Sequence, residues 1–467
     1  MIYIFLAVVS ALTLAVAIIN KNINKMFDII EYKGELRIYE EQMKSYDLND
    51  PEQLQDYVDD KNEYDMLVLA RNYKTYSAEH LYVYNEVGPI ISCLNESEFI
   101  TKDKNQYNEC KSEYDKKIYF LNHFDWKKQL LDKKEENKQE IQRLELAISS
   151  GTLKDRESEN ELKLLKLEKE IIDYRIKKGI PWDNGGLSEE LFILSGSYED
   201  YLSKENINSH NRDAMIDKQN SEASYKIAKY KFDNDLLYDT GRTYAEENTA
   251  TTVKNVFAGG TLTLLFLILV GGGIIAEEFN KGTIKQLLLK PYKRSKIFMS
   301  KVFATLILFF LFLVVYGLIT AIINGIVFGE IRSIFEPILV YDFNRSKVLE
   351  YNIITSCLET FIAILPMFLI ELGIAILLGV LTTNTAVAIV VPIAVNTGAG
   401  ILNMLAKGRI AAWLPSMCWD LSIFLHGALP QFKYSSLPIA IFVDVVCIVL
   451  LFGISMILFM KKDIKNQ

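Results

Sequence analysis

Residues 277–301 read EEFNKGTIKQLLLKPYKRSKIFMSK and separate two long apolar runs. We call this stretch the basic loop, because only two acidic residues accompany its seven basic ones, which are Lys281, Lys285, Lys290, Lys293, Arg294, Lys296 and Lys301. A short loop this rich in Lys and Arg beside membrane spans is typical of the cytoplasmic side. Gly282 and Thr283 can end one helix and cap the next, and Pro291 can end that short helix. The pattern predicts a stiff basic turn between two membrane helices.

The charges of the chain are distributed unevenly. Residues 21–254 contain 35 Lys and Arg against 48 Asp and Glu, whereas the rest contains 16 against 11. Half of the 467 residues are hydrophobic, which allows several membrane spans beside one soluble domain of ordinary size. No basic stripe indicates nucleic-acid binding, and no Cys/His spacing is typical of a metal site. We therefore expect neither a nucleic-acid partner nor a bound metal.

Six apolar runs approach or exceed the roughly 20 residues that a membrane helix needs. They are residues 2–19, 256–276, 302–328, 352–381, 385–406 and 437–460. Residues 407–436 are too interrupted by Pro for a span, and their aromatic residues indicate a re-entrant or interfacial segment. We predict an all-α membrane protein with six transmembrane helices: the first over residues 1–19, and five more in a membrane domain over residues 255–467.

The run at residues 2–19 has a competing interpretation. A cleaved signal peptide would need a basic stretch before the run and a small-residue cleavage site after it, and the sequence shows neither. Local charge nevertheless favours the reverse orientation for this helix, since Lys21 and Lys25 follow it and nothing basic precedes it. Either the start of the chain is shortened or the later spans decide the orientation. With the later spans deciding, we expect both termini in the cytoplasm and residues 20–254 outside it.

Residues 20–254 are polar and mostly helical in pattern. Within them, residues 126–178 contain two charged segments that carry apolar residues at spacings of three and four, separated by a Ser-Ser-Gly-Thr turn. This pattern predicts a helical hairpin or antiparallel coiled coil, for which a stalk or spacer is the simpler role than a ligand site. Cys93 and Cys110 are the only cysteines in this region and can form a disulfide if it lies outside the cytoplasm.

Three acidic residues lie within the predicted spans, where burying a charge is costly and marks a functional candidate. Glu371 lies deep in its span, five residues after Pro366, and is our candidate for a substrate path or for conformational coupling. A neutral or internally paired structural carboxyl is the alternative. Glu359 and Asp444 lie closer to the ends of their spans, and for them the structural interpretation is favoured.

The order of residues in the basic loop resembles the loop after the second span of ABC type-2 permeases, the membrane subunits of ABC exporters. The resemblance is close over residues 277–301, agrees in span layout over residues 256–460, and says little about residues 20–250. It implies a bacterial cytoplasmic-membrane protein that is not itself an enzyme. A separate P-loop ATPase subunit would bind ATP and Mg and dock on the basic loop. A second permease subunit, identical or different, would complete the translocation path.

The resemblance also assigns roles within the basic loop. The residues concerned are Glu277, Glu278, Gly282, Thr283, Leu287, Leu288, Pro291, Arg294 and Lys301. The acidic pair would stabilise the helix end, the Gly-Thr pair would form the turn, the Leu-Leu-Pro group would form the docking helix, and the last two would hold the membrane edge. The sequence contains no Gly-x-x-x-x-Gly-Lys-Ser/Thr phosphate loop, so hydrolysis by that route requires the partner.

Two other functions fit part of the sequence. An ABC-linked mechanotransmission protein would use the large outer domain to move extracytoplasmic partners without transporting anything, although such proteins typically have four spans. A membrane-anchored receptor or adhesion protein would use the helical hairpin as its working end, and it would not need the ordered basic loop. For an exporter, the substrate stays open among peptide antibiotics, lipids and drugs.

Overall fold

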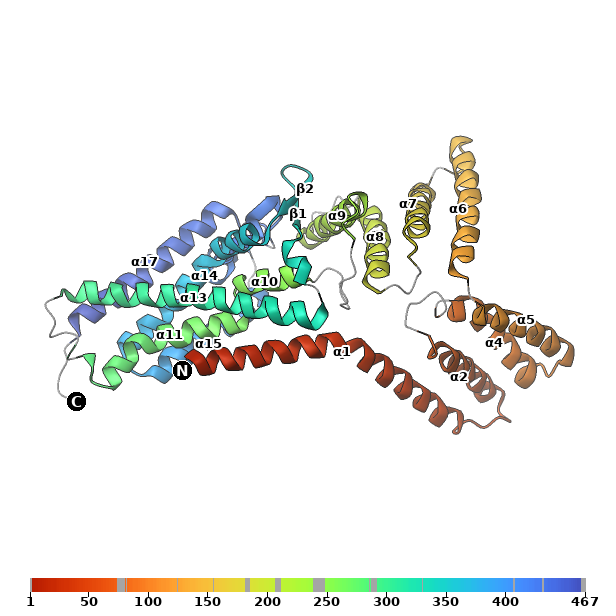
Figure 1. Ribbon diagram of the computed structural model, residues 1–467, viewed down its shortest axis with the longest axis horizontal. Helices are drawn as coiled ribbons and strands as arrows, with labels where there is room; N and C mark the ends of the chain where they lie inside the picture. Colours follow the sequence, from red (N-terminus) through yellow and green to blue (C-terminus); the bar gives the residue numbers. More distant parts are fainter. Residues whose placement is uncertain are drawn as a thin grey trace. The chain divides into compact units, whose positions relative to one another are not determined.

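The computed structural model describes residues 2–73, 80, 82–123, 125–153, 155–180, 185–205, 211–237, 248–284, 286, 292–329, 331–405, 408–430 and 432–462. The described chain is predominantly helical (Figure 1). It divides into two compact units. Unit 1 comprises Met1–Ala17, Asp200–Asp235 and Glu246–Gln467, and unit 2 comprises Ile18–Glu199 and Leu236–Ala245.

Unit 1 contains the long apolar helices. They are α10 (Thr249–Phe257), α11 (Thr261–Asn280), α13 (Arg294–Phe328), α14 (Ile353–Thr382), α15 (Thr385–Leu405) and α17 (Leu437–Lys461). Among the described residues, five stretches are long and apolar enough to cross a membrane, with α10 and α11 counted as one. The apolar stretch Phe5–Ile19, at the start of α1 (Ile2–Met43), is shorter than these five. The chain is therefore a mostly helical membrane protein.

Helix α14 lies at the centre of unit 1. It packs against α10, α11, α15 and α17, and its Phe368 contacts Phe309 of α13 edge to face. Close approach of α11 to α15 depends on Gly272, where an added Cβ would lie 2.6 Å from the backbone oxygen of Ala388. Small residues allow such close helix contacts in membrane proteins. The Gly-Gly-Gly run of α11 thus serves packing.

The connection after α13 contains a β-hairpin, which the prediction of an all-α fold did not include. Strand β1 (Ile338–Asp342) pairs antiparallel with β2 (Lys347–Tyr351). The Asp342 carboxylate accepts hydrogen bonds from the backbone N–H groups of Asn344 (2.9 Å) and Arg345 (3.2 Å), and these bonds form the turn. The strands are only five residues each, so their apolar pattern is too short to stand out in a mixed-charge connection.

The described part of residues 407–436 contains only short helical turns, as the interruptions in the sequence predict. These are η4 (Arg409–Trp413), α16 (Pro415–Cys418) and η5 (Leu421–Gly427). Asn403 of α15 anchors this segment: its amide donates to the Ser416 backbone oxygen (3.1 Å) and accepts from the Ser416 hydroxyl (2.6 Å). Asn403 thus links α15 to α16 through its side chain.

Helix α9 (Arg212–Asp233) lies in the polar region of residues 20–254 but belongs to unit 1. The hydroxyl of Tyr341 in β1 donates to Glu222 of α9 (2.9 Å), and the hydroxyl of Tyr230 in α9 donates to Glu350 of β2 (2.9 Å). Side-chain hydrogen bonds thus join α9 to the hairpin.

Unit 2 is built of helices and short helical turns. They are the part of α1 that follows Ala17, then α2 (Pro51–Ala70), η1 (Val83–Val87), α4 (Gly88–Asn95), η2 (Glu96–Ile100), α5 (Lys104–Asn122), α6 (Trp126–Ser149) and α7 (Arg156–Lys178), and α8 (Gly185–Lys204) has its first part here. Helices α6 and α7 pack side by side as the predicted hairpin. The amide of Asn137 donates to Glu168 (2.9 Å), and Lys166 pairs with Glu145 (2.7 Å). Leu144 of α6 and Leu167 of α7 are buried.

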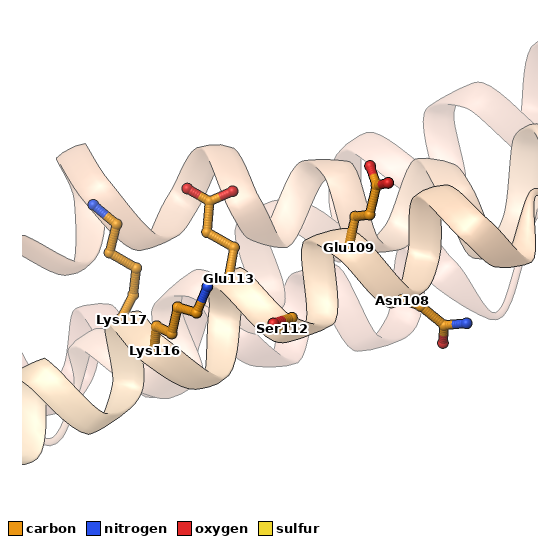
Figure 2. A pocket seen from close by; sticks show the side chains of 6 residues that line it. All are labelled: Asn108, Glu109, Ser112, Glu113, Lys116 and Lys117. Atoms are coloured by element: carbon orange, nitrogen blue, oxygen red, sulfur yellow. The ribbon is translucent and has the colours of Figure 1, made fainter.

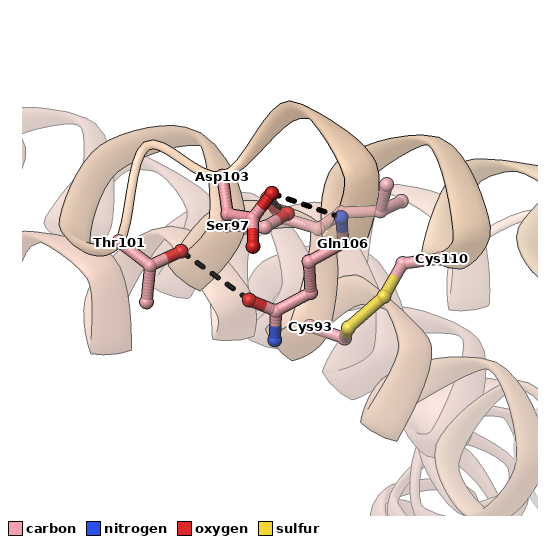
Figure 3. Close-up of a disulfide and its surroundings, with 7 residues drawn as sticks. Cys93, Ser97, Thr101, Asp103, Gln106 and Cys110 are labelled. Atoms are coloured by element: carbon pink, nitrogen blue, oxygen red, sulfur yellow. Dashed lines mark hydrogen bonds between the residues drawn. A yellow bond between two sulfur atoms is a disulfide. The ribbon is translucent and has the colours of Figure 1, made fainter.

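A disulfide joins Cys93 of α4 to Cys110 of α5, with a Cα–Cα distance of 6.2 Å (Figure 3). Asp103 begins α5, because its carboxylate accepts the backbone N–H of Asn105 (2.9 Å). The Thr101 hydroxyl donates to Gln106 (3.3 Å) close by (Figure 3). The cross-link therefore closes a short loop around a well-capped helix start.

Candidate coupling site at the basic loop

Two ion pairs organise the first half of the basic loop. Glu278, at the end of α11, pairs with Lys301 of α13, and the two side chains are only 20% and 23% exposed. Glu277 pairs with Lys281 one helical turn later at 2.7 Å, and this pair is more open to solvent. Gly282 follows with φ +70°, a left-handed conformation that favours glycine. The chain can therefore reverse at Gly282 while Glu278 and Lys301 hold α11 and α13 together.

The second half of the site connects α13 to the end of α17. The Arg294 guanidinium donates to the backbone oxygens of Met460 (2.9 Å) and Lys462 (3.2 Å). These oxygens belong to the last turn of α17, whose carbonyl groups lack partners within the helix. A cation at this helix end is also favoured by the helix dipole. Arg294 therefore acts as a cap that binds the start of α13 to the C-terminal end of α17.

Lys462 makes the corresponding contact with α14. Its ammonium donates to the backbone oxygens of Val380 and Leu381, the latter at 3.2 Å, and lies 5.0 Å from the centre of the Phe279 ring. Burial lowers the pKa of Lys462 from its ordinary value. The Asn280 amide of α11 donates to the Thr385 hydroxyl of α15 (3.0 Å). The ends of five helices are thus linked by side chains around the basic loop.

Six of the nine loop residues to which the resemblance assigns roles lie within the described structure. Ile284, beside them, is 2% exposed and anchors the loop in the core of unit 1. The other three, Leu287, Leu288 and Pro291, lie outside the described residues. The predicted docking helix therefore stays a prediction. Asn280 and Lys462 were not predicted, because nothing local in the sequence indicates which distant carbonyl or hydroxyl group they contact.

The three acidic residues of the spans are not brought together. Glu371 of α14 is 0% exposed; its Oε1 accepts a hydrogen bond from the Asn396 amide of α15 (3.1 Å), and its Oε2 has no hydrogen-bond partner among the described residues. The Asn396 contact is a hydrogen bond between α14 and α15. The Glu371 carboxyl is therefore fully enclosed by the surrounding helices.

Asp444 and Glu359 have different surroundings. Asp444 of α17 is 2% exposed, and its carboxylate has no hydrogen-bond partner in the described chain. Burial, and the neighbouring Asp444, raise the pKa of the Cys418 thiol in α16 to about 11. Glu359, near the start of α14, pairs with His426 of η5 at 3.3 Å. This contact lies at the end of unit 1 that carries the β-hairpin. There the backbone oxygen of His426 accepts a hydrogen bond from the backbone N–H of Phe343 (2.8 Å).

A shallow depression of about 550 Å³ lies on α5 of unit 2 (Figure 2). Its lining residues all come from one helix: Asn108, Glu109, Ser112, Glu113, Lys116 and Lys117. Lys117 is already paired with Glu86 at 2.6 Å. An open groove along one charged helix face encloses little of a ligand, so it is a weaker candidate than the basic loop. Among the described residues, no group of His, Cys, Asp and Glu is arranged to hold a metal ion.

Comparison with known proteins identifies a family. Residues 226–465 match the family described as "Protein of unknown function (DUF2705)", and the chain belongs to this family. The chain is 29% identical over 253 residues to the uncharacterized protein YhcI of Bacillus subtilis (strain 168), covering 51% of this chain and 74% of YhcI. It is 33% identical over 141 residues to the uncharacterized membrane protein YdbK of the same organism, covering 30% of this chain and 51% of YdbK. No solved structure matches the chain.

Proposed function

We propose that this member of the family is the membrane subunit of an ATP-driven exporter of the ABC type-2 class. A separate P-loop ATPase would bind at the basic loop and supply the energy, and a second permease subunit would complete the path. The proposal includes the short apolar start of α1 as a sixth span. It places both termini in the cytoplasm and residues 20–254 outside, with the α6–α7 hairpin as an extracytoplasmic coiled coil.

The observation that carries the proposal is the linkage around the basic loop. A partner that pushes on this loop would act on α11 and α13 through Glu278 and Lys301. It would act on α17 through Arg294, and Lys462 would extend the linkage to α14. Motion applied at one surface would therefore reach four helices at once. Packed and paired side chains of this kind carry coupling between distant sites, which supports a role for the loop in transmitting ATPase closure to the helices.

The distribution of charge supports a cytoplasmic position for the basic loop. Lys281, Lys293 and Lys296 of the loop are exposed, and Lys461 ends α17 on the same side of the bundle. The opposite connection, residues 329–352, holds three basic and four acidic residues. An excess of Lys and Arg on one side of short membrane connections is the usual mark of the cytoplasm.

The test is co-purification of the ATPase with tagged full-length chain. We expect a stoichiometric P-loop ATPase with the wild type, and its loss when Lys281, Lys293 and Lys296 are all changed to Glu. The matched control reverses Arg332 and Lys347, exposed basic residues at the opposite end of unit 1. Retention of the ATPase by the loop variant, or equal loss in the control, would contradict the docking role.

An ABC-linked mechanotransmission protein is the second candidate, supported by the size of unit 2 and by its paired α6–α7 helices. It shares the ATPase partner and differs in moving no substrate across the membrane. A receptor or adhesion protein would need no ATPase at all. ATP-dependent accumulation of a substrate in sealed inverted vesicles would support export, whereas ATPase stimulation without accumulation would favour mechanotransmission.

A further inference from the structure

An exposed group of aromatic and apolar side chains lies at the end of unit 1 opposite the basic loop. We call it the aromatic patch, and it consists of Arg409, Trp413, Tyr434, Leu437, Ile441 and Phe442. Helix α15 starts beside Asn280 and ends at Leu405, and α17 starts at Leu437 and ends beside Arg294, so both helices bring their other ends here. The patch therefore lies one bundle length from the candidate coupling site.

The fold of η4 exposes the patch. Ala411 and Ala412 are buried, at 2% and 1% exposure, where η4 packs on α16 and α17. These small residues fill the contact and leave Trp413 on the outside, where it is 53% exposed. Its ring meets that of Phe442 at a centroid distance of 6.3 Å and nearly edge to face. The segment thus presents two large rings on its outer surface.

The aromatic patch also contains one cation, Arg409. The Arg409 guanidinium lies 5.3 Å from the centre of the Tyr434 ring. Residues 406–436 contain three Lys and Arg against one Asp, and that Asp420 accepts the backbone N–H of Ser422 at the start of η5. A cation beside exposed aromatic rings is complementary to an anionic headgroup that adjoins acyl chains.

The depth of the patch agrees with a membrane interface. Phe442 lies five residues into α17, or about 7.5 Å at 1.5 Å per residue. Beyond it, Val445 and Val449 continue the exposed apolar face of α17, at 52% and 63% exposure. Trp and Tyr gather where the hydrocarbon core meets the headgroups, and Arg extends its charge toward the polar side. The patch therefore joins an apolar face suited to lipid chains with a cationic rim suited to phosphate.

From these observations we infer that the aromatic patch binds an anionic phospholipid in the leaflet opposite the basic loop. Arg409 binds the phosphate, and the rings of Trp413 and Phe442 contact the upper acyl chain. Bound lipid would fix the segment between α15 and α17, which Asn403 and Ser416 already tie to α15. The inference rests only on membrane embedding and stays valid whether or not the chain is an exporter.

The test uses the full chain in vesicles of phosphatidylcholine that contain dibrominated phosphatidylglycerol or, in a parallel set, dibrominated phosphatidylcholine. We expect bromine to quench tryptophan fluorescence more strongly from phosphatidylglycerol, and Trp413→Phe to remove that difference. Arg409→Gln should lower the preference for phosphatidylglycerol by about fivefold, the effect of one basic residue near a membrane surface. Lys347→Gln, an exposed cation of the hairpin, is the matched control and should leave the preference unchanged.

Two results would overturn the inference. One is a phosphatidylglycerol preference that neither Trp413→Phe nor Arg409→Gln alters. The other is a pair of observations: no brominated lipid quenches the fluorescence of Trp413, and a cysteine placed at position 413 cross-links two chains. A second copy of the chain would then cover the patch. Circular dichroism of each variant distinguishes a local effect from loss of folding.

Discussion

Breaking the Glu278–Lys301 pair should loosen the connection between α11 and α13. Both side chains are about four-fifths buried, so each depends on the other for its charge partner. A hydrogen bond to a charged group contributes about 1.5–3 kcal/mol, and removal of one partner leaves the other charge unpaired in a partly buried place. We therefore expect Glu278→Gln and Lys301→Met each to lower the free energy of unfolding by about 2 kcal/mol.

Glu277 supplies a matched control, because its pair with Lys281 joins neighbouring turns and lies open to solvent, at 37% and 67% exposure. An exposed pair contributes at most about 0.5 kcal/mol, so Glu277→Gln should change little. For a domain of this size, about 2 kcal/mol corresponds to a fall in Tm of roughly 4–8 °C. Thermal unfolding of the purified chain in detergent would measure both variants.

The exchange Glu278→Lys with Lys301→Glu completes the experiment. It restores opposite charges across the same gap, and we expect it to recover at least half of the lost Tm. The reasoning is refuted if Glu278→Gln and Glu277→Gln lower the Tm equally. It is also refuted if the double exchange is as destabilised as the sum of its two single variants, because the two residues would then act independently.

Other contacts give further predictions. Gly272→Ala should destabilise the bundle by about 1–3 kcal/mol through the clash with the Ala388 backbone, measured by thermal unfolding, whereas Gly453→Ala on an open face should not. Glu371→Gln keeps the oxygen that accepts a hydrogen bond from α15, so it should preserve the Tm, whereas Glu371→Leu should lower the free energy of unfolding by about 1–3 kcal/mol. Burial, with the bond to α9, raises the pKa of Tyr341 to about 12. A tyrosine in the unfolded chain ionises at about pH 10. The contribution of Tyr341 to the free energy of unfolding should therefore be present below that pH and fall as the pH rises toward 12. Tyr341→Phe should weaken this pH dependence of the free energy of unfolding.

The positions of the membrane helices follow from the sequence, because a span needs a long apolar run whatever it packs against. The predicted run over residues 385–406 corresponds to α15 to within one residue, and the run over residues 302–328 lies within α13, which begins eight residues earlier at Arg294. The hairpin of α6 and α7 was equally predictable, since spacings of three and four residues are a property of one helix face. The position of the basic loop between two apolar helices and its turn at Gly282 were also predictable from its charge and from the glycine.

The tertiary structure alone decided which distant groups meet. No local pattern pairs Lys462 with a carbonyl of Leu381, or Asn396 with Glu371, because such contacts depend on how neighbouring helices are aligned along their lengths. The short β-hairpin and its bond from Tyr341 to α9 also depended on contacts that only the folded chain provides. The sequence by itself thus determined which segments enter the membrane and where the basic loop lies. The packing of the helices decided which polar side chains meet. Hydrophobic burial is non-directional and tolerates many alignments of two helices, whereas each hydrogen bond or ion pair forms in only one alignment.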